Sequence, residues 1–369
     1  MPDADRPDRS SAVARVATWE NTLVLLVVAF LVVASVSVEF FGTSRNAGFL
    51  VLELVPVLVL AMSATLVIVT GQIDLSIASV VGLTGAFMGV LWNAGLPLET
   101  IVPLAVGLGA VLGAVNGVLV AALGLPSLAV TIGTLALYRG LAFVLLGDTA
   151  VADWPRSFTG WVIGTLPGTA VPNVVLPVMV LVAATAVLLH ATPVGRAIVA
   201  IGANATAAHF AGVRVRLVTF WLFVLSGATA GLVGVFWTLR FSSARGDNAV
   251  GLELTVVAAV LLGGVSIFGG RGTVPGVVAG VVLLVSLQNA LRLANVSTES
   301  LTVVTGLLLI LSVLLPNVLR QARAALATAG RPPDRTPPAP GPAQPAPEAA
   351  TPGPGPAPSS PASTPTTRT

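Results

Sequence analysis

A short polar segment between two long apolar runs holds the residue types best suited to chemistry in this sequence. It reads Gln72-Ile73-Asp74-Leu75-Ser76 and combines an amide, a carboxylate and a hydroxyl. A charged side chain at membrane depth is costly, so it normally faces protein or a water-filled path rather than lipid. The segment therefore indicates part of a transport pathway. A helix N-cap at Asp74 or Ser76 is the structural alternative, and the two interpretations are compatible.

The composition is typical of an all-α polytopic membrane protein. Of the 369 residues, 55% are hydrophobic and 9% are charged, whereas soluble domains have about 25% charged residues. The sequence contains no cysteine and no lysine, which excludes thiolate chemistry and the Walker A motif, whose lysine reaches the nucleotide phosphates. We therefore expect no enzyme activity and no cofactor, with ATP bound by a partner subunit if it is used. Two separated histidines predict no metal site, and scattered arginines predict no nucleic-acid surface.

About ten transmembrane helices are expected, because ten apolar runs have roughly the length that spans a bilayer. The runs lie at 23–40, 47–70, 75–95, 100–123, 126–147, 173–191, 216–239, 252–269, 274–294 and 300–317. The first run is too long for a cleaved signal peptide. We expect residues 1–19 to be a cytoplasmic N-terminal segment, residues 20–318 a transmembrane permease domain, and residues 319–369 a disordered cytoplasmic tail rich in proline and alanine.

Arginine placement predicts the orientation in the membrane. With a cytoplasmic N-terminus, loops 192–215 and 270–273 and the C-terminus are cytoplasmic too, and these segments hold more arginines than the opposite loops. The opposite loops also hold several acidic residues. This bias agrees with the positive-inside rule, so we expect both termini in the cytoplasm.

Two helix starts resemble each other in sequence. Gly71–Ser76 and Gly251–Thr255 each read glycine, acid, leucine and hydroxyl before a Val/Ala-rich helix, with Asp74 and Glu253 as the acids. The expected topology places them on opposite sides of the membrane. Matching segments of opposed orientation indicate an inverted repeat, whose halves meet at the substrate path. Chance similarity in so biased a composition is the alternative.

The cytoplasmic loop 192–215 is dominated by small residues. Asn204 followed by Ala205–Phe210 predicts a short capped helix closed by Gly212. Small residues allow the backbone to approach a partner closely, which favours docking to another protein. A helix lying on the membrane surface is the alternative, but its apolar face would be weak.

Four motifs together resemble the permeases of bacterial ABC sugar importers of the ribose, rhamnose and autoinducer group. The first is Ile73–Ser76, and two longer blocks are Pro126–Gly140 and Leu262–Gly276. The fourth lies in the cytoplasmic loop and consists of Gly195, Arg196, Ala200, Ile201, Gly202, Asn204, Ala207, Ala208 and Gly212. The resemblance covers about residues 45–317. Gln72 stands where many members have glycine, and the proline-rich tail is not a family feature.

The resemblance implies a permease of the type II ABC-importer kind in the cytoplasmic membrane of a bacterium. Its cargo would be a rhamnose- or ribose-like monosaccharide, and the blocks around Pro126–Gly140 and Gly251–Gly276 are most similar to the rhamnose-type branch. Its partners would be an ABC ATPase, an extracytoplasmic sugar-binding protein, a second permease copy or paralogue, and membrane lipid. The loop would be the coupling helix seated in the ATPase, with Gly195, Arg196, Gly202, Asn204, Ala207, Ala208 and Gly212 as the coupling residues.

Polar residues inside or beside the spans are candidates for lining or supporting the pathway. They are Gln72, Asp74, Ser76, Asn116, Thr131, Thr134, Arg139, Glu253, Gln288 and Asn289. Arg139 falls near the middle of its span, so it should be paired, and Asp74 and Glu53 are the candidate partners. The uncharged residues could instead make hydrogen bonds between helices. An alternative function is an ion-coupled secondary transporter that uses Asp74 and Glu253 as ion sites.

Overall fold

The computed structural model describes residues 19–329. The N-terminal residues 1–18 and the residues from 330 onward, which contain most of the predicted disordered tail, lie outside the described part. The description below concerns the unit of residues 1–318, since residues 319–369 form a second unit.

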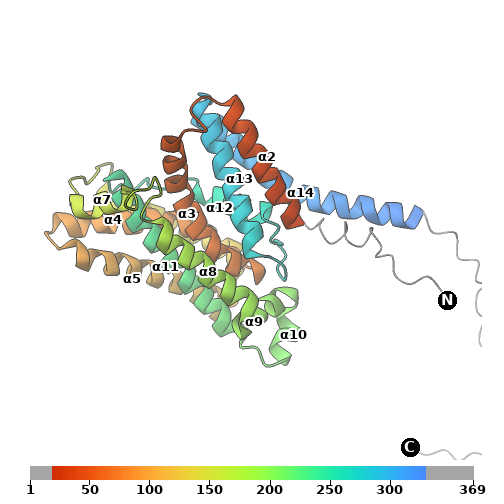
Figure 1. The fold of residues 1–369 in the computed structure, drawn as a ribbon. Coiled ribbons are helices and arrows are strands. Elements are labelled where there is room, and N and C mark those ends of the chain that lie inside the picture. Colours follow the sequence, from red (N-terminus) through yellow and green to blue (C-terminus); the bar gives the residue numbers. More distant parts are fainter. Residues whose placement is uncertain (1–18, 330–369) are drawn as a thin grey trace, which may run out of the picture. The chain divides into compact units, whose positions relative to one another are not determined.

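The described chain is helical throughout, and its only β-type pairings are two isolated bridges. Figure 1 shows the helices in chain order. They are α2 (Trp19–Ser37), α3 (Ser44–Val69), α4 (Ile77–Asn93), α5 (Leu98–Gly117) with a π-helical extension (Val118–Ala122), α6 (Ser127–Leu146), α7 (Arg156–Ile163), α8 (Val175–Ala191), α9 (Pro193–Ala203), α10 (Ala205–Phe210), α11 (Val215–Phe241), α12 (Leu252–Leu262), α13 (Val274–Leu293) and α14 (Thr298–Ala329).

One end of the helical unit, here called the α9 end, gathers four segments that are distant in sequence. Trp19 Nε1 at the start of α2 donates to the Leu262 carbonyl (3.1 Å), and Thr273 Oγ1 donates to Glu20 (2.6 Å). Gly270 N donates to the Val69 carbonyl at the end of α3 (2.8 Å). The loop 263–273 therefore meets the start of α2 and the end of α3, and its Gly269 and Gly270 also touch the end of α9.

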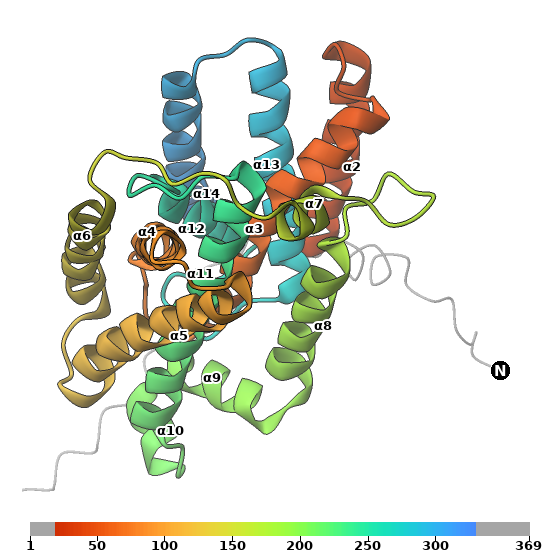
Figure 2. The ribbon, with the colours of Figure 1, turned by 90° about the vertical axis from the view of Figure 1, so that its left-hand side faces the viewer.

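The opposite end, here called the α7 end, is joined by its own contacts. Val151 and Ala244 exchange two backbone hydrogen bonds (3.0 and 2.9 Å), and the rings of Trp92 and Trp154 stack 5.3 Å apart. Figure 1 shows α8 running from the α7 side to the α9–α10 pair, and Figure 2 shows α9 and α10 at the lower edge of the helical body. Successive apolar helices run alternately between the two ends, as the sequence predicts.

The number of full-length spans is smaller than the ten expected. Six helices of the described chain are long and apolar enough to cross a bilayer, namely α2, α3, α5 with its extension, α6, α11 and α13. A seventh is obtained if α8 and α9, which meet at a bend of 68°, form one broken span. The helices α4, α12 and the apolar part of α14 are shorter. The expected number of ten is matched only if the shorter apolar helices α4, α12 and α14 are counted together with the full-length spans.

The two similar sequence segments occupy matching places. Each follows a long helix, α3 or α11, and each opens a short one, α4 or α12. Gly71 and Gly251 both have positive φ, +78° and +82°, which glycine adopts without strain. The short helix of each pair packs against the long helix of the other, α4 on α11 and α12 on α3. Because Gly71 lies at the α9 end and Gly251 at the α7 end, the arrangement agrees with the predicted inverted repeat.

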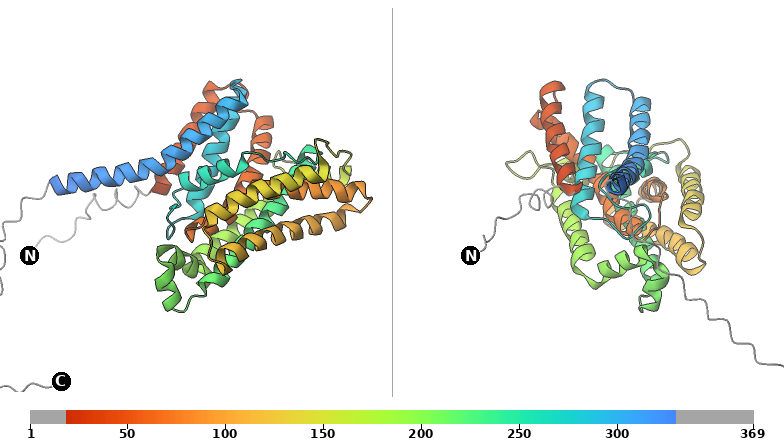
Figure 3. Two further views of the ribbon diagram at one scale, coloured as in Figure 1. Left: turned by 180° about the vertical axis from the view of Figure 1, so that it is seen from behind. Right: turned by 90° about the vertical axis from the view of Figure 1, so that its right-hand side faces the viewer.

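Close helix contacts depend on glycines that the sequence patterns above do not include. A Cβ at Gly113 of α5 would overlap the Phe223 carbonyl of α11, and one at Gly227 of α11 would overlap the Gly109 carbonyl of α5. Gly109 and Gly113 of α5 are four residues apart, which is the small-residue spacing that lets membrane helices approach closely. Figure 3 shows the same core from behind, with α6 alongside α4.

Candidate functional site

The Asp74 carboxylate lies inside the helix packing and is 4% exposed. Its Oδ1 accepts hydrogen bonds from the Ser76 backbone nitrogen (3.0 Å) and hydroxyl (2.6 Å), and its Oδ2 accepts one from the Ser226 hydroxyl of α11 (2.7 Å). Asn116 of α5 donates to the Ser76 hydroxyl (2.8 Å). Both carboxylate oxygens therefore accept hydrogen bonds, from Ser76 and from α11, and α5 joins the cluster through the Ser76 hydroxyl.

The backbone beside Asp74 is fixed to α6. Ile73 N donates to the Ser127 hydroxyl (3.1 Å), and Thr131 Oγ1 donates to the Ile73 carbonyl (3.2 Å). Thr134, one turn further along α6, donates only to carbonyls of its own helix. The segment 72–76 is thus joined to α5, α6 and α11 at once, which fixes where α4 begins.

These contacts favour a supporting role for the Asp74 cluster. Ser76 is the N-cap residue of α4 but its side chain makes no capping hydrogen bond, and Asp74 accepts from Ser76 N just before the helix instead of capping it. Asp74 has no cationic partner among the described residues. Ser76, Asn116 and Thr131 are at most 1% exposed. Gln72 is the member of the segment that stays partly exposed with a polar side chain. The cluster holds the helix start in place, and Gln72 is its one member positioned to meet solvent.

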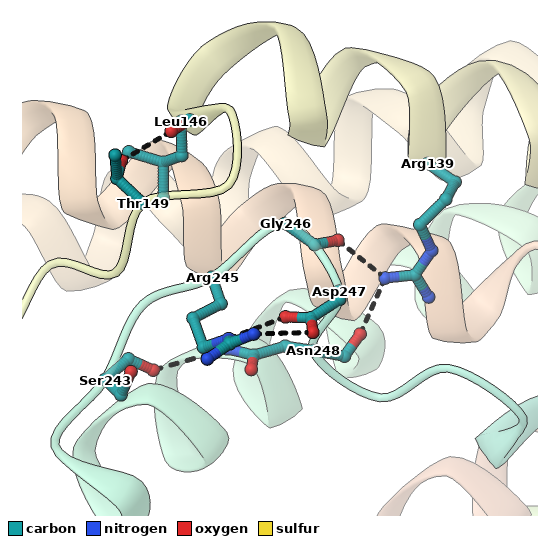
Figure 4. Close-up of polar contacts among 8 residues, drawn as sticks. All are labelled: Arg139, Leu146, Thr149, Ser243, Arg245, Gly246, Asp247 and Asn248. Carbon is teal, nitrogen blue, oxygen red and sulfur yellow. Dashed lines mark hydrogen bonds and ion pairs between the residues drawn. The ribbon is translucent and has the colours of Figure 1, made fainter.

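Arg139 does not form the predicted ion pair with Asp74 or Glu53. Its guanidinium donates instead to the carbonyls of Gly246 (2.9 Å) and Asn248 (2.7 Å) in the loop before α12, as Figure 4 shows. It also donates to a carbonyl of α4, that of Ala78 (3.1 Å). The prediction was wrong because carbonyls of an irregular loop have no helical partners, and Arg139 supplies their donors.

The remaining predicted acids and amides belong to the α7 end. Glu53 pairs with Arg292 and accepts a hydrogen bond from Asn289 (3.3 Å), whose carbonyl oxygen accepts one from Asn46 (3.0 Å). Gln288 donates to Thr305 of α14 (2.9 Å). The Glu253 Oε2 atom is buried without a hydrogen-bond partner in the described part of the chain. Asp74 and Glu253 therefore sit on segments at opposite ends.

The predicted short helix of the loop 192–215 is present as α10. The side-chain oxygen Oδ1 of Asn204 accepts a hydrogen bond from Ala207 N (2.9 Å), which caps the helix. Gly212 adopts φ +87° after the helix. A second helix, α9, precedes it and is capped by Thr192, whose hydroxyl accepts from Gly195 N (3.2 Å). The loop is therefore a two-helix unit rather than one short helix.

The residues of this two-helix unit divide into inward and outward sets. Gly195, Gly202 and Ala208 pack against the chain itself, whereas the outward set stays exposed. The outward set consists of Arg196, Asn204, Ala207, Phe210 and Gly212. Phe210 is 85% exposed, which is unusual for a large apolar side chain. Sequence analysis assigned no role to Phe210, although an aromatic at the end of an alanine-rich helix was visible.

Four glycines, Gly71, Gly202, Gly269 and Gly270, form what we call the glycine junction. A Cβ at Gly202 would overlap the Val69 carbonyl and the Gly270 nitrogen, and one at Gly269 would lie 2.8 Å from Gly71 N. The backbone of α9 therefore touches the end of α3 two residues before Gly71. The junction places the two-helix unit in direct contact with the end of α3, immediately before the segment that carries Asp74.

Comparison with known proteins gives consistent matches over most of the chain. Residues 46–313 match the family described as branched-chain amino acid transport system / permease component. The autoinducer 2 import system permease protein LsrD of Yersinia enterocolitica is 32% identical over 308 residues, covering 80% of this chain and 90% of the relative. The L-arabinose ABC transporter permease protein AraH of Azospirillum brasilense is 33% identical, covering 88% and 99%. The ribose import permease protein RbsC of Haemophilus influenzae is 31% identical, covering 81% and 93%. No solved structure matches this chain.

Proposed function

Because this chain belongs to the branched-chain amino acid transport system / permease component family, we propose that it is the permease subunit of an ABC importer that carries a monosaccharide. The chain is a multi-pass permease of the bacterial inner membrane. Two of the relatives are named for ribose and L-arabinose, and a third for autoinducer 2. Those names support a small polyhydroxyl cargo for this chain, of the ribose or rhamnose kind.

The observation that carries the proposal is the exposed two-helix unit α9–α10. It presents a short alanine-rich helix with the exposed Phe210 ring at its end and an exposed Arg196 on α9, and it is fixed to the rest of the chain through the glycine junction. Buried aromatic anchors surrounded by small contacts are typical of stable protein interfaces. A groove on an ATP-hydrolysing subunit would accept this surface, which makes α10 the candidate coupling helix.

Energy from ATP must enter through such a partner. The chain has no lysine, so it has no Walker A lysine to hold nucleotide phosphates. In the proposed cycle, closure of two ATPase subunits moves α9 and α10. The glycine junction transmits that movement to the end of α3 and to the loop 263–273, because its backbone atoms are already in contact. The helical bundles then change which side of the membrane the pathway faces.

The proposed assembly contains further subunits. A second permease, identical or a paralogue, would complete the pathway, and an extracytoplasmic binding protein would deliver the sugar. The arginine bias supports cytoplasmic termini and a cytoplasmic α9 end. No observation favours the ion-coupled alternative. Both carboxylate oxygens of Asp74 already accept hydrogen bonds from the protein, and Glu253 lies at the opposite end of the helical unit.

The proposal is tested by purifying the tagged chain together with the ABC ATPase encoded beside it. We expect a stable complex with the wild-type chain and at least tenfold weaker recovery with Phe210→Ala, because truncating an interface anchor costs about 2 kcal/mol or more. Phe49→Ala is the matched control, since it removes another exposed ring from α3, toward the α7 end. It should leave recovery unchanged.

Reconstituted uptake completes the test. The assembled complex should transport a sugar only when ATP is present on the side of the membrane that the α9 end faces. Dissipating ion gradients should not change the uptake. If the wild-type chain recruits no ATPase and uptake follows an ion gradient, the importer proposal fails.

A further inference from the structure

A polar cavity of about 450 Å³ lies at the α7 end, between the loop 243–251, the start of α12, the end of α13 and the first turns of α14. Binding pockets for small molecules range over about 300–1,000 Å³, so this cavity suits a small ligand. The side chains that bring polar groups or an aromatic ring to it are Trp237, Arg245, Asp247, Asn248, Thr255, Gln288, Arg292, Thr298, Thr302 and Thr305. We call it the polar cavity.

A bidentate ion pair lies at its margin. Arg245 donates from Nε to Asp247 Oδ1 (2.8 Å) and from a terminal nitrogen to Oδ2 (2.9 Å). The hydrogen bond from Arg245 holds the pKa of the Asp247 carboxyl below its ordinary value, so the group stays ionised. About half of each side chain remains exposed. A carboxylate has further lone pairs beyond those Arg245 uses, and they are available to ligand hydroxyls.

Neutral polar groups face the same space from the other helices. Gln288 uses its amide nitrogen on Thr305 (2.9 Å), which leaves its carbonyl oxygen as an acceptor. Thr255, at the first turn of α12, makes no hydrogen bond within the described part of the chain. Trp237 adds a partly exposed indole, held beside Phe241 at 5.4 Å between ring centres. Convergent acceptors, a hydroxyl and one aromatic surface are the groups that a sugar ring requires.

Arg139 determines the position of one wall. It binds the carbonyls of Gly246 and Asn248, which flank Asp247, and it binds Ala78 of α4 at the same time. Figure 4 shows Arg139 reaching this loop from α6. The Asp247 carboxylate is therefore placed by a residue that does not itself line the cavity. Arg139 acts as a positioning residue.

A second, larger cavity of about 840 Å³ provides the contrast. It is lined by valines, leucines, Phe158, Trp161 and Phe236, and Ser157 is its only hydroxyl-bearing side chain. It offers no charged or amide group to a polyhydroxyl ligand. Its chemistry suits lipid chains, so the two cavities differ in kind and only the smaller one fits a sugar.

We propose that the polar cavity is a monosaccharide-binding site in which Asp247, Gln288 and Thr255 bond to sugar hydroxyls and Trp237 covers an apolar face. The site deepens the proposed function, on which it rests, by naming the residues that select the cargo. It lies at the end opposite the proposed ATPase surface, where a sugar arriving from outside would first meet the permease.

The natural absence of cysteine permits a test without background labelling. Thr302→Cys places one thiol in the cavity, and Ser300→Cys places one on the exposed surface nearby as the matched control. The importer complex is assembled in nanodiscs, because maltoside detergents carry a sugar head group. D-ribose, L-arabinose and L-rhamnose are first compared in uptake by the wild-type complex. Modification of each thiol by a charged methanethiosulfonate reagent is then timed with and without the transported sugar.

We expect the transported sugar, at about ten times its Kd, to slow modification of Thr302→Cys about tenfold and to leave Ser300→Cys unchanged. Thr255→Cys serves as a second cavity thiol if the first variant does not assemble. Transport by the wild type without protection of either cavity thiol overturns the site while leaving the importer function standing. Failure of all three sugars to be transported overturns the sugar-importer proposal and the site together.

A second measurement uses Asp247→Asn, which keeps the size of the side chain and removes its charge. We expect KM for sugar uptake to rise about tenfold, with kcat within about twofold, which is the pattern of lost substrate binding. An unchanged KM would overturn the assignment of Asp247.

Discussion

The glycine junction at the α9 end and the polar cavity at the α7 end are held together by different kinds of contact. At the glycine junction of the α9 end, Gly202, Gly269 and Gly270 bring backbone directly against backbone. At the α7 end, Arg139, Arg245 and Asp247 make side-chain hydrogen bonds that arrange a loop around the polar cavity. Backbone contact suits the transmission of movement, because it leaves no flexible group to absorb it. Side-chain contact suits recognition, because each polar group can be matched to a ligand.

The largest expected effect is at the glycine junction. Gly202→Ala should destabilise the protein by about 3 kcal/mol or more, since its Cβ would overlap the Val69 carbonyl and the Gly270 nitrogen, which cannot move aside as a side chain can. Thermal unfolding of the purified chain in nanodiscs measures this. Gly133→Ala, in open space on α6, should have no effect. Equal stability of the two variants would contradict the view that the α9 end depends on backbone contact.

Removal of the Asp74 carboxylate should have the next largest effect. Asp74→Ala leaves the buried hydroxyls of Ser76 and Ser226 without their acceptor, at a cost of about 1–3 kcal/mol. Asp74→Asn retains one acceptor oxygen and should lose less. Thermal unfolding and ATP-driven uptake are measured together. Uptake lost from a fully stable Asp74→Asn protein would show that the carboxylate works in the pathway itself rather than as a support.

Arg139 tests whether the α7 end serves recognition. Arg139→Gln removes the donors to the Gly246 and Asn248 carbonyls, so Asp247 should lose its position. We expect KM for sugar uptake to rise about tenfold, equivalent to about 1.4 kcal/mol, with kcat nearly unchanged. Arg139→Lys, which supplies fewer donors, should be intermediate. A fall in kcat with unchanged KM would instead connect Arg139 to the movement of the helices.

The smallest effect is expected at Thr134. Its buried hydroxyl donates only to carbonyls of its own helix, which are already used in that helix. Thr134→Val should therefore change stability and uptake KM very little, by about 0.5 kcal/mol or less. A clear loss of uptake would show that Thr134 faces substrate in another conformation of the transport cycle.

Much of the fold could be predicted because lipid imposes strong rules on a sequence. Apolar length located the helices, and the short echo between Gly71–Ser76 and Gly251–Thr255 indicated two opposed halves. The span count was less accurate. An eleven-residue helix such as α12 is followed by apolar loop residues that extend its hydrophobic run, so hydropathy alone makes it look longer than it is.

The candidate site was predicted in its residues more than in their roles. Sequence reasoning selected Gly202 for contact with a partner, whereas its backbone contacts the chain's own Val69 and Gly270. It selected Arg139 for an ion pair, whereas its acceptors are three backbone carbonyls, two of them more than a hundred residues away in sequence. Backbone carbonyls are present at every residue, so no sequence pattern marks which of them a buried arginine will bind.

By itself, the sequence indicated that this protein crosses a membrane and that any ATP it uses would be bound by a partner, and it showed which family motifs the chain carries. Composition and the absence of lysine are sufficient for the first two conclusions, because they depend on which residues exist rather than on where they meet. Tertiary structure decided that Asp74 supports a helix start, that glycines connect the loop 192–215 to that start, and that Asp247, Gln288 and Thr255 share a cavity. Those outcomes depend on the packing of helices that are distant in sequence, and packing sets distances that residue order does not contain.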